Sequence, residues 1–204
     1  PAYGNSEERL GQLLRRDQDW KIITKVGEIF ENGQSTFDFS AAHTRMSVER
    51  SLKRLGRECI DIVLVHSDVN DMHIINNEGV LGELERMKQE GKLRAYGMST
   101  KTVEGGLWVV EHCDVVMATC NLRDTHDLPV IARAHELNKG VVVKKGLLSG
   151  HAATAAGSGV EDAMRFVFSQ LGVSSMIVGT INPMHLRDNV AIVQQIYIGQ
   201  ANRA

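Results

Sequence analysis

Residues 60–67 read IDIVLVHS, and this run decides how the rest of the chain is interpreted. Every residue from Ile60 to Val65 is apolar except Asp61, and the run then ends in His66. A short run that is apolar on both faces predicts a fully buried strand. Such strands belong to parallel sheets that are covered by helices. The first expectation is therefore an α/β fold.

The same pattern continues in both directions, with apolar or β-branched runs alternating with amphipathic helical segments. Strands are predicted at 21–25, 60–65, 92–98, 114–120, 141–145 and 174–179. Helices are predicted at 46–56, 80–91, 103–112, 127–140, 161–172 and 185–197, with Gly91 and Gly140 ending two of them. Six strand–helix pairs fit either an open doubly wound sheet or a (β/α)8 barrel. The phosphate-binding pattern GxGxxG, typical of the open dinucleotide-binding fold, does not follow the first strand.

Composition excludes several classes of function. The chain has 204 residues, 43% of them hydrophobic, which suffices for the core of one domain spanning 1–204. The 23 Lys and Arg nearly balance the 25 Asp and Glu, so no nucleic-acid partner is expected. The apolar runs are too short to cross a bilayer. Cys59, Cys113 and Cys120 lack CxxC spacing and are interpreted as buried thiols, which predicts a cytoplasmic protein. The histidines lack metal-ligand spacing, so no metal site is expected.

Polar residues close the predicted strands one after another. In a parallel (β/α) barrel, the carboxyl ends of the strands build the active site. Side chains at these ends are therefore expected to converge on one face of the sheet. The residues in question are Lys25, His66, Ser99, Thr100, Asn121, Lys144, Lys145, Gly179 and Thr180.

Five motifs together resemble the aldo-keto reductase family, in the family's order and over nearly the whole chain. They are PAYGNSEERLGQLL (1–14), IITKVG (22–27), DIVLVHS (61–67), GMST (97–100) and GTINPMHLRDN (179–189). The resemblance implies a parallel (β/α)8 TIM barrel and NADP(H)-dependent interconversion of carbonyls and alcohols. It also implies that the first two strands and the first helix are absent upstream of Pro1. At about 30 residues or more for each βαβ unit, roughly 35–55 residues precede this sequence in the family.

The resemblance assigns catalytic roles to Tyr3, Lys25 and His66. Tyr3 is expected to be the general acid in reduction, and a neighbouring cation such as Lys25 favours loss of its phenolic proton. The carboxylate that pairs with this lysine in the family lies three residues before Pro1, outside this sequence. His66 is expected to bond the substrate carbonyl oxygen. Tyr3 and His66 would together stabilise the developing alkoxide.

The resemblance also implies a nicotinamide cofactor, with NADP(H) preferred over NAD(H). Ser99 matches a serine that binds the carboxamide, the GLLSG loop (146–150) matches a segment along the pyrophosphate, and 179–189 matches the adenosine end. The predicted contacts are Ser99, Thr100, Asn121, Gly146, Leu147, Ser149, Gly179, Thr180, His185, Asp188 and Asn189. Gly179 and His185 stand where many relatives have a lysine and an arginine for the 2′-phosphate, so the NADP(H) preference is the default of the family.

Two other functions remain open at this point. One is a cofactor-binding regulatory subunit with little turnover, like the potassium-channel β-subunits that share the fold. Met117 and Lys144 favour it, because they replace a glutamine and an aromatic residue near the nicotinamide. The other is a Schiff-base enzyme that uses Lys144 or Lys145. The combination of Tyr3, Lys25 and His66 favours a reductase of a small carbonyl substrate, without a membrane partner.

Overall fold

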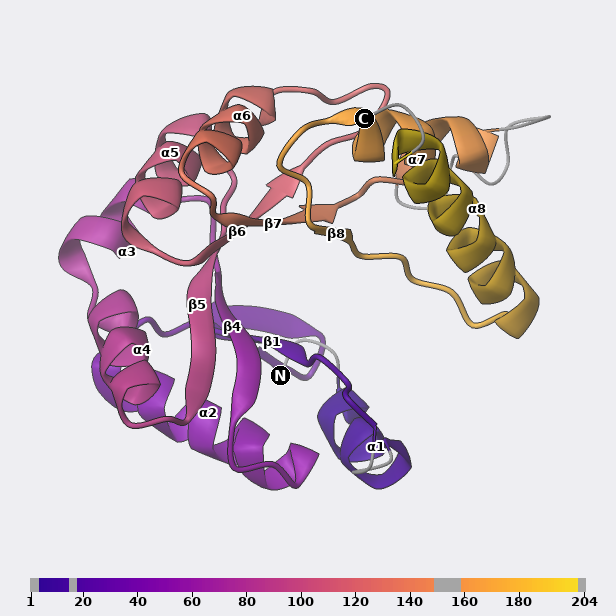
Figure 1. The fold of residues 1–204 in the computed structure, drawn as a ribbon. Helices are drawn as coiled ribbons and strands as arrows, with labels where there is room; N and C mark the ends of the chain where they lie inside the picture. The colour runs from indigo at the N-terminus through magenta and orange to yellow at the C-terminus, as the bar shows by residue number, and fades with distance from the viewer. Residues whose placement is uncertain (1–3, 15–17, 149–158, 202–204) are drawn as a thin grey trace. The chain divides into compact units, whose positions relative to one another are not determined.

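The computed structural model describes residues 4–14, 18–148 and 159–201 (Figure 1). The chain divides into two compact units, Pro1–Val116 and Met117–Ala204, which we call the first and the second unit. A single domain spanning 1–204 stays a prediction. No helix among the described residues has the length and apolar character that a membrane span requires.

The first unit contains three neighbouring parallel strands, with β4 in the middle (Figure 1). These strands are β1 (Ile23–Val26), β4 (Ile60–His66) and β5 (Leu93–Ser99). In the register, Lys25 lies opposite Leu64, and His66 lies opposite Ser99. Val63, Leu64 and Val65 are fully buried. The structure thus confirms the parallel α/β pattern, and it brings the carboxyl ends of three strands to one edge.

The helices of the first unit begin and end largely for local reasons. They include α2 (Ala41–Leu55), α3 (Asp71–Asn77), α4 (Val80–Gln89) and α5 (Val103–His112). At the start of α2, Ser40 Oγ accepts a hydrogen bond from the backbone N–H of His43 at 3.2 Å, and at its end Gly56 takes the left-handed conformation. The short helix α3 is absent from the sequence-based prediction.

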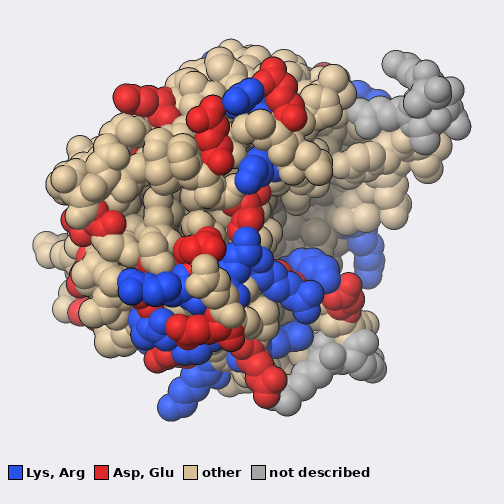
Figure 2. All heavy atoms as spheres, turned by 60° about the vertical axis from the view of Figure 1, so that its left-hand side comes forward, with Lys and Arg blue, Asp and Glu red and all other residues tan. Residues whose placement is uncertain are grey.

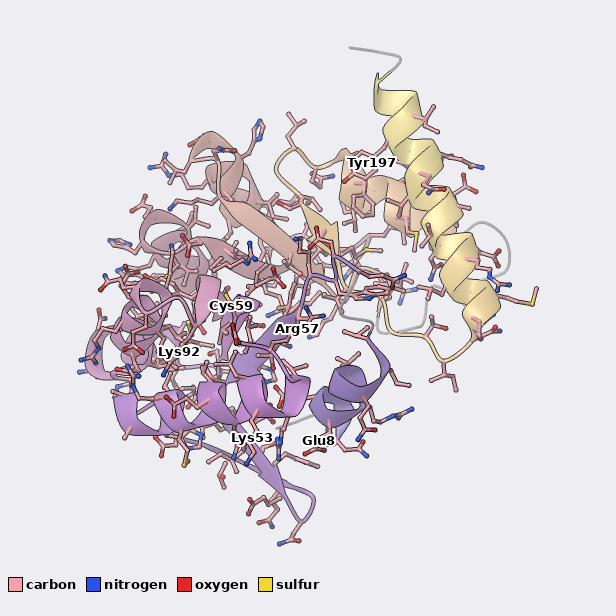
Figure 3. The ribbon with its side chains drawn as sticks, turned by 60° about the horizontal axis from the view of Figure 1, so that its bottom comes forward. Glu8, Lys53, Arg57, Cys59, Lys92 and Tyr197 are labelled. Atoms are coloured by element: carbon pink, nitrogen blue, oxygen red, sulfur yellow. The ribbon has the colours of Figure 1, made fainter. Side chains whose placement is uncertain are left out.

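Helix α1 (Ser6–Leu13) packs against the end of α2. The contact is close, since a Cβ on Gly11 would lie 2.2 Å from the carbonyl oxygen of Arg54. Asn5 and Glu8, which fit a capping box by spacing, do not form one, because Asn5 makes no capping hydrogen bond. Glu8 instead lies beside α2 (Figure 3), where its Oε1 is 3.0 Å from Arg54 Nε. Ion pairing between the two helices has replaced capping within one.

A β-hairpin interrupts the connection between β1 and α2. Its strands, β2 (Glu28–Glu31) and β3 (Gln34–Phe37), form a separate antiparallel two-stranded sheet. Asn32 and Gly33 at its tip both have positive φ, of 51° and 80°. Positive φ at both central residues defines the tight turn that Asn-Gly favours. The sequence-based prediction had only a loop here.

The second unit contains β7 (Gly140–Lys144) between β6 (Val115–Thr119), which begins at the end of the first unit, and β8 (Ser175–Met176). Its helices are α6 (Leu128–Glu136), α7 (Gly159–Ser169) and α8 (Pro183–Ala201). The prediction that Gly140 ends a helix is wrong. The backbone leaves α6 near Asn138, at φ 53°, and Gly140 opens β7. The predicted strand at 174–179 is reduced to two residues.

Charged side chains on the surface of the first unit are paired across helices. Arg45 on α2 reaches Glu83 at 2.5 Å and Glu90 at 2.6 Å, and Lys92 reaches Glu49 at 2.6 Å. On the face shown in Figure 2, positive and negative side chains are interspersed. The electrostatic potential of this face is therefore mixed in sign and would not attract a strongly charged partner.

Two of the three cysteines fit the expectation of buried thiols. Cys113 and Cys120 are buried, whereas Cys59 is half-buried. Burial raises the pKa of the Cys120 thiol to about 11, and Asp127 and Asp124 add to that effect. A thiol with so high a pKa is a poor nucleophile at neutral pH.

Candidate active site

Lys25 and His66 come from adjacent parallel strands of the first unit. Lys25 is the third residue of β1, and His66 is the last residue of β4. Because β1 and β4 run parallel in register, the two side chains belong to the same edge of the sheet. Burial lowers the pKa of His66, and the nearby positive charge of Lys25 lowers it further. The structure thus brings these two predicted residues together, while Tyr3 lies outside the described residues.

A carboxylate that the sequence analysis missed also lies at this edge. Glu28, at the start of β2, has its Oε2 2.5 Å from Nδ1 of His66. The Asn-Gly pair at 32–33 is a turn signal that could have revealed the hairpin that carries Glu28. No pattern in the sequence indicates that its first residue would meet His66.

A second missed residue, Asp71, joins the loops that follow β4 and β5. It is 1% exposed, and it accepts four hydrogen bonds. Ser67 Oγ donates to Oδ1 at 2.5 Å, while the backbone N–H groups of Lys101 and Thr102, both at 2.8 Å, and the Thr102 hydroxyl at 2.7 Å donate to Oδ2. A Cβ on Gly105 would lie 2.5 Å from the Cβ of Asp71, so this site requires glycine.

The Asp71 network fixes the segment that holds two predicted cofactor residues. Ser99 and Thr100, each 1% exposed, lie between the end of β5 and the two N–H groups that Asp71 binds. Ser99 is also the register partner of His66. Asp71 therefore ties the loop after His66 to the loop after Ser99.

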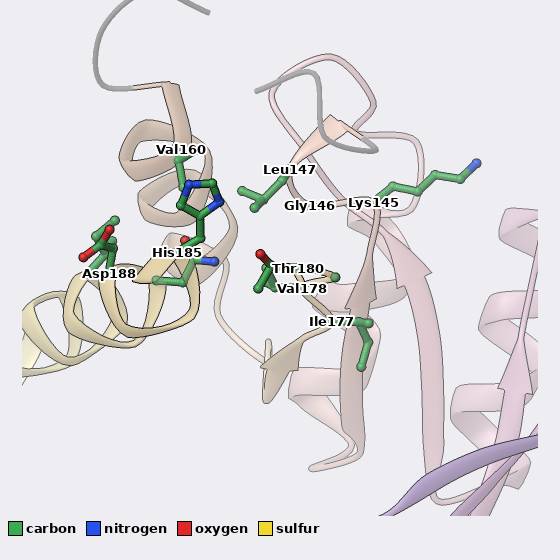
Figure 4. Close-up of a pocket in the computed structure, with 12 residues that line it drawn as sticks. Lys145, Gly146, Leu147, Val160, Ile177, Val178, Thr180, His185 and Asp188 are labelled. Carbon is green, nitrogen blue, oxygen red and sulfur yellow. The ribbon is translucent and has the colours of Figure 1, made fainter. Parts of the chain in front are cut away.

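The second unit contains a pocket of about 630 Å³ (Figure 4). Its walls come from the turn after β7, the start of α7, the segment after β8 and the first turns of α8. The lining residues are Lys145, Gly146, Leu147, Val160, Ile177, Val178, Gly179, Thr180, His185, Asp188, Asn189 and Ile192. Seven of them are predicted cofactor contacts: Gly146, Leu147, Gly179, Thr180, His185, Asp188 and Asn189. Ser149 lies outside the described residues.

One wall of the pocket is a tight turn held by backbone contacts. The N–H of Leu148 donates to the carbonyl of Lys145 at 2.9 Å, and both residues have positive φ, of 53° and 58°. Asn121 supports the turn, since its Nδ2 donates to the same carbonyl at 3.2 Å. A Cβ on Gly146 would lie 2.2 Å from Sδ of Met176, so glycine allows the turn to pack on β8. The predicted contact Asn121 thus supports the wall without lining the pocket.

The opposite wall is the start of α8. Thr180 Oγ1 accepts a hydrogen bond from the N–H of Asn182 at 3.1 Å, and Asn182 Oδ1 accepts one from the N–H of Met184 at 2.9 Å. These hydrogen bonds hold the backbone of the segment from Thr180 to Met184, where α8 begins. A helix N-terminus carries a partial positive charge that favours anionic groups such as phosphate. Together with the apolar side chains of Val160 and Ile177, it can hold a ligand that has both a ring and a phosphate.

Comparison with known proteins agrees with the fold. Residues 1–156 match the model of the Aldo/keto reductase family. A candidate aldo-keto reductase from Pseudomonas aeruginosa, solved by crystallography, is 52% identical, with a TM-score of 0.89 over 97% of this chain and 76% of its own. The chain belongs to the aldo/keto reductase family, and its α/β fold of parallel strands is that of the family's (β/α)8 barrels.

Relatives of characterised or assigned activity are more distant. L-galactose dehydrogenase from Arabidopsis thaliana is 26% identical over 96% of this chain and 72% of its own length. D-arabinose 1-dehydrogenase from Saccharomyces cerevisiae is 31% identical over 60% of this chain and 40% of its own length. Both names describe oxidoreductases. The chain therefore spans well under the full length of the proteins it resembles.

Proposed function

We propose that the protein is a nicotinamide-dependent carbonyl reductase in which Tyr3 is the general acid. The observation that carries the proposal is the pairing of Lys25 and His66 at the ends of adjacent parallel strands. Membership of the aldo/keto reductase family supports the same class of reaction.

The proposed roles follow from the chemistry of these side chains. A bound nicotinamide would supply the hydride, and the chain would orient the carbonyl and provide the proton. Tyr3 would donate that proton, assisted by the positive charge of Lys25. A hydrogen bond from His66 to the carbonyl oxygen would stabilise the alkoxide as negative charge develops on it.

The pocket of the second unit is suited to the adenosine and phosphate end of the cofactor. It combines the N-terminus of α8, the backbone of the Lys145–Leu148 turn and apolar walls. We propose NADP(H) over NAD(H), with Thr180 as the hydroxyl donor to a 2′-phosphate. Lys145, which is not among the cofactor contacts expected from the sequence, also lines this pocket, although its side chain extends away from Thr180 and His185 (Figure 4). Ser99 and Thr100 remain the proposed contacts of the nicotinamide.

Fluorescence titration with NADPH and NADH, followed by a panel of aldehydes, ketones and aldoses, tests the proposal. We expect binding of both cofactors, tighter binding of NADPH, and reduction of at least one carbonyl. Aldoses belong in the panel because two relatives are named for sugars. Absence of cofactor binding would contradict the oxidoreductase assignment. Binding without turnover would favour the regulatory alternative that Met117 and Lys144 suggest.

The Tyr3→Phe variant tests the acid itself. Removing one hydroxyl eliminates the proton donor and leaves the ring in place, so kcat should fall on the order of 100-fold or more. Cofactor affinity should stay nearly unchanged, because the phenol acts in the transition state. Single-turnover reduction and a parallel NADPH titration measure the two quantities. A variant that retains most of its activity would remove Tyr3 from this role.

A further inference from the structure

A carboxylate from outside the parallel sheet meets His66. Glu28 Oε2 lies 2.5 Å from His66 Nδ1, and only 13% of the Glu28 side chain and 20% of the His66 side chain are exposed. The two atoms approach closely without the full angular geometry of a hydrogen bond. The negative charge of the carboxylate oxygen still favours hydrogen on Nδ1, because two lone pairs at this distance would repel. The pair is therefore more than a surface contact between opposite charges.

The hairpin holds Glu28 in place from both sides. Its second oxygen, Oε1, accepts a hydrogen bond from Ser35 Oγ at 2.6 Å across the strand pair. The residue before it, Gly27, has φ 99°, and a Cβ there would lie 2.5 Å from the ring of Phe39. The turn from β1 into β2 therefore needs glycine, and this turn determines the position of the Glu28 backbone.

We propose that Glu28 is a positioning residue that controls which nitrogen of His66 carries hydrogen during carbonyl reduction, a role that rests on the proposed function. While the pair holds two protons, one lies between Glu28 and Nδ1 and the other stays on Nε2. Nε2 can then donate to the substrate oxygen. When the pair loses a proton, the remaining one stays at Nδ1 beside the carboxylate. Nε2 becomes an acceptor, which cannot stabilise an alkoxide.

Charges from three elements act on this pair. Burial lowers the pKa of His66 most, and Lys25 at the end of β1 lowers it further. Glu28 on β2 raises it through its negative charge, and Lys101 after β5 lowers it. The net result is a His66 pKa below the ordinary value of 6.5. The rate of reduction is thus expected to fall as pH rises through that region.

The Glu28→Gln variant removes the negative charge of residue 28 and keeps a side chain of the same size next to His66. Ser35 can still donate to the amide oxygen, which leaves the amide N–H₂ to face Nδ1 and donate to it. This arrangement keeps hydrogen on Nε2 of a neutral imidazole at every pH above the His66 pKa. Loss of the Glu28 charge lowers the pKa of His66 further, so the imidazole of the variant stays neutral at more acid pH than in the parent. A neutral imidazole is a weaker donor than a charged one, so kcat at the acid end should fall about tenfold. The dependence of kcat on pH between about 5 and 8 should flatten.

Glu31→Gln is the matched control, because Glu31 is an exposed glutamate on the same strand. It should keep the pH profile of the parent. Nitrogen NMR of His66 provides a second readout that does not depend on turnover: above pH 7, hydrogen should lie on Nδ1 in the parent and on Nε2 in Glu28→Gln.

The two proposals fail in different ways. If the parent and Glu28→Gln share one pH profile and one tautomer, the role of Glu28 is overturned although the enzyme is a reductase. If the parent reduces no carbonyl, the proposed function is overturned. The spectra then decide by themselves whether Glu28 controls the tautomer of His66.

Discussion

The edge of the first unit around His66 and the pocket of the second unit are built by different means. Around His66, side chains contact one another: Glu28 lies against His66, and the buried Asp71 accepts hydrogen bonds from Ser67 and Thr102. Around the pocket, the geometry comes mainly from backbone, through the left-handed turn after β7 and the start of α8. The side chains of Asn121, Thr180 and Asn182 bond to that backbone. The lining residues Gly179, Thr180 and His185 are exposed.

This difference teaches which substitutions each region tolerates. Groups that carry a reaction must be held in one geometry and one protonation state, and buried side-chain networks achieve this. A pocket made by backbone can instead change many of its side chains and keep its shape. The replacement of expected residues by Gly179 and His185 is consistent with that tolerance.

The largest effect is expected from Asp71→Asn. The amide N–H₂ cannot accept the hydrogen bonds that converge on the carboxylate, so a buried donor loses its partner. We expect the free energy of unfolding to fall by about 2–4 kcal/mol. Urea denaturation should show a lower midpoint with an unchanged m-value.

Asp68→Asn is the control for this change. Asp68 lies in the loop just before α3, and it accepts hydrogen bonds from the backbone N–H and the side-chain amide of Asn70, at 2.9 Å and 3.3 Å. Its substitution should change stability by about 0.5 kcal/mol or less. If Asp71→Asn were equally mild, the loops after β4 and β5 would not depend on the network, and the contrast between the two regions would weaken.

An intermediate effect is expected from Gly146→Ala. The new methyl group meets the Met176 sulfur, which must move and displace the turn against β8. The Kd for the proposed cofactor should rise about tenfold, since overpacking costs roughly 1–3 kcal/mol. Isothermal titration measures the change.

Adding Met176→Ala should restore much of the affinity, because it removes the atom that clashes. Gly82→Ala on α4 is the control, since nothing lies within 4 Å of the added Cβ there. If the double variant bound no better than Gly146→Ala, the close packing of the turn on β8 would not be the cause.

The smallest effect is expected from Thr180→Val, which removes a hydroxyl and keeps the shape. Losing one hydrogen bond of ordinary strength costs about 1 kcal/mol, so the Kd for NADPH should rise about three- to tenfold. Turnover at saturating cofactor should not change, because the group is proposed to bind away from the reacting atoms. An equal fall in kcat would contradict that placement.

Much of the fold was predictable because its strands are buried on both faces. The run at 60–65 became β4 with His66 at its end, and the runs at 92–98 and 141–145 also became strands. Element ends were less predictable. Gly140 opens a strand because Asn138, which also tolerates the left-handed conformation, already turns the chain after α6. The capping box expected from Asn5 and Glu8 does not form, and the Glu8 carboxylate pairs with Arg54 on α2 instead.

The site was predictable where strands end and unpredictable where contacts are long-range. Lys25 and His66 follow from strand order alone, because parallel strands bring their carboxyl ends together. Glu28 contacts His66, and Asp71 accepts a hydrogen bond from the N–H of Lys101. In both cases the partner lies about 30 or more positions away in the sequence, and no local pattern encodes such a partner. The loop at 146–150 was expected from the resemblance. The left-handed conformation of Lys145 and Leu148 was not, because neither residue is a glycine or asparagine.

The β2–β3 hairpin forms a sheet of its own, so its length and sequence do not enter the register of β1, β4 and β5. A surface hairpin of about ten residues, such as this one, can be replaced by another without changing the strands on either side of it. If Glu28 controls His66, such an exchange would alter the pH at which an enzyme works and leave its scaffold untouched. The hairpin would then be a part that evolution, or an engineer, can replace independently of the barrel.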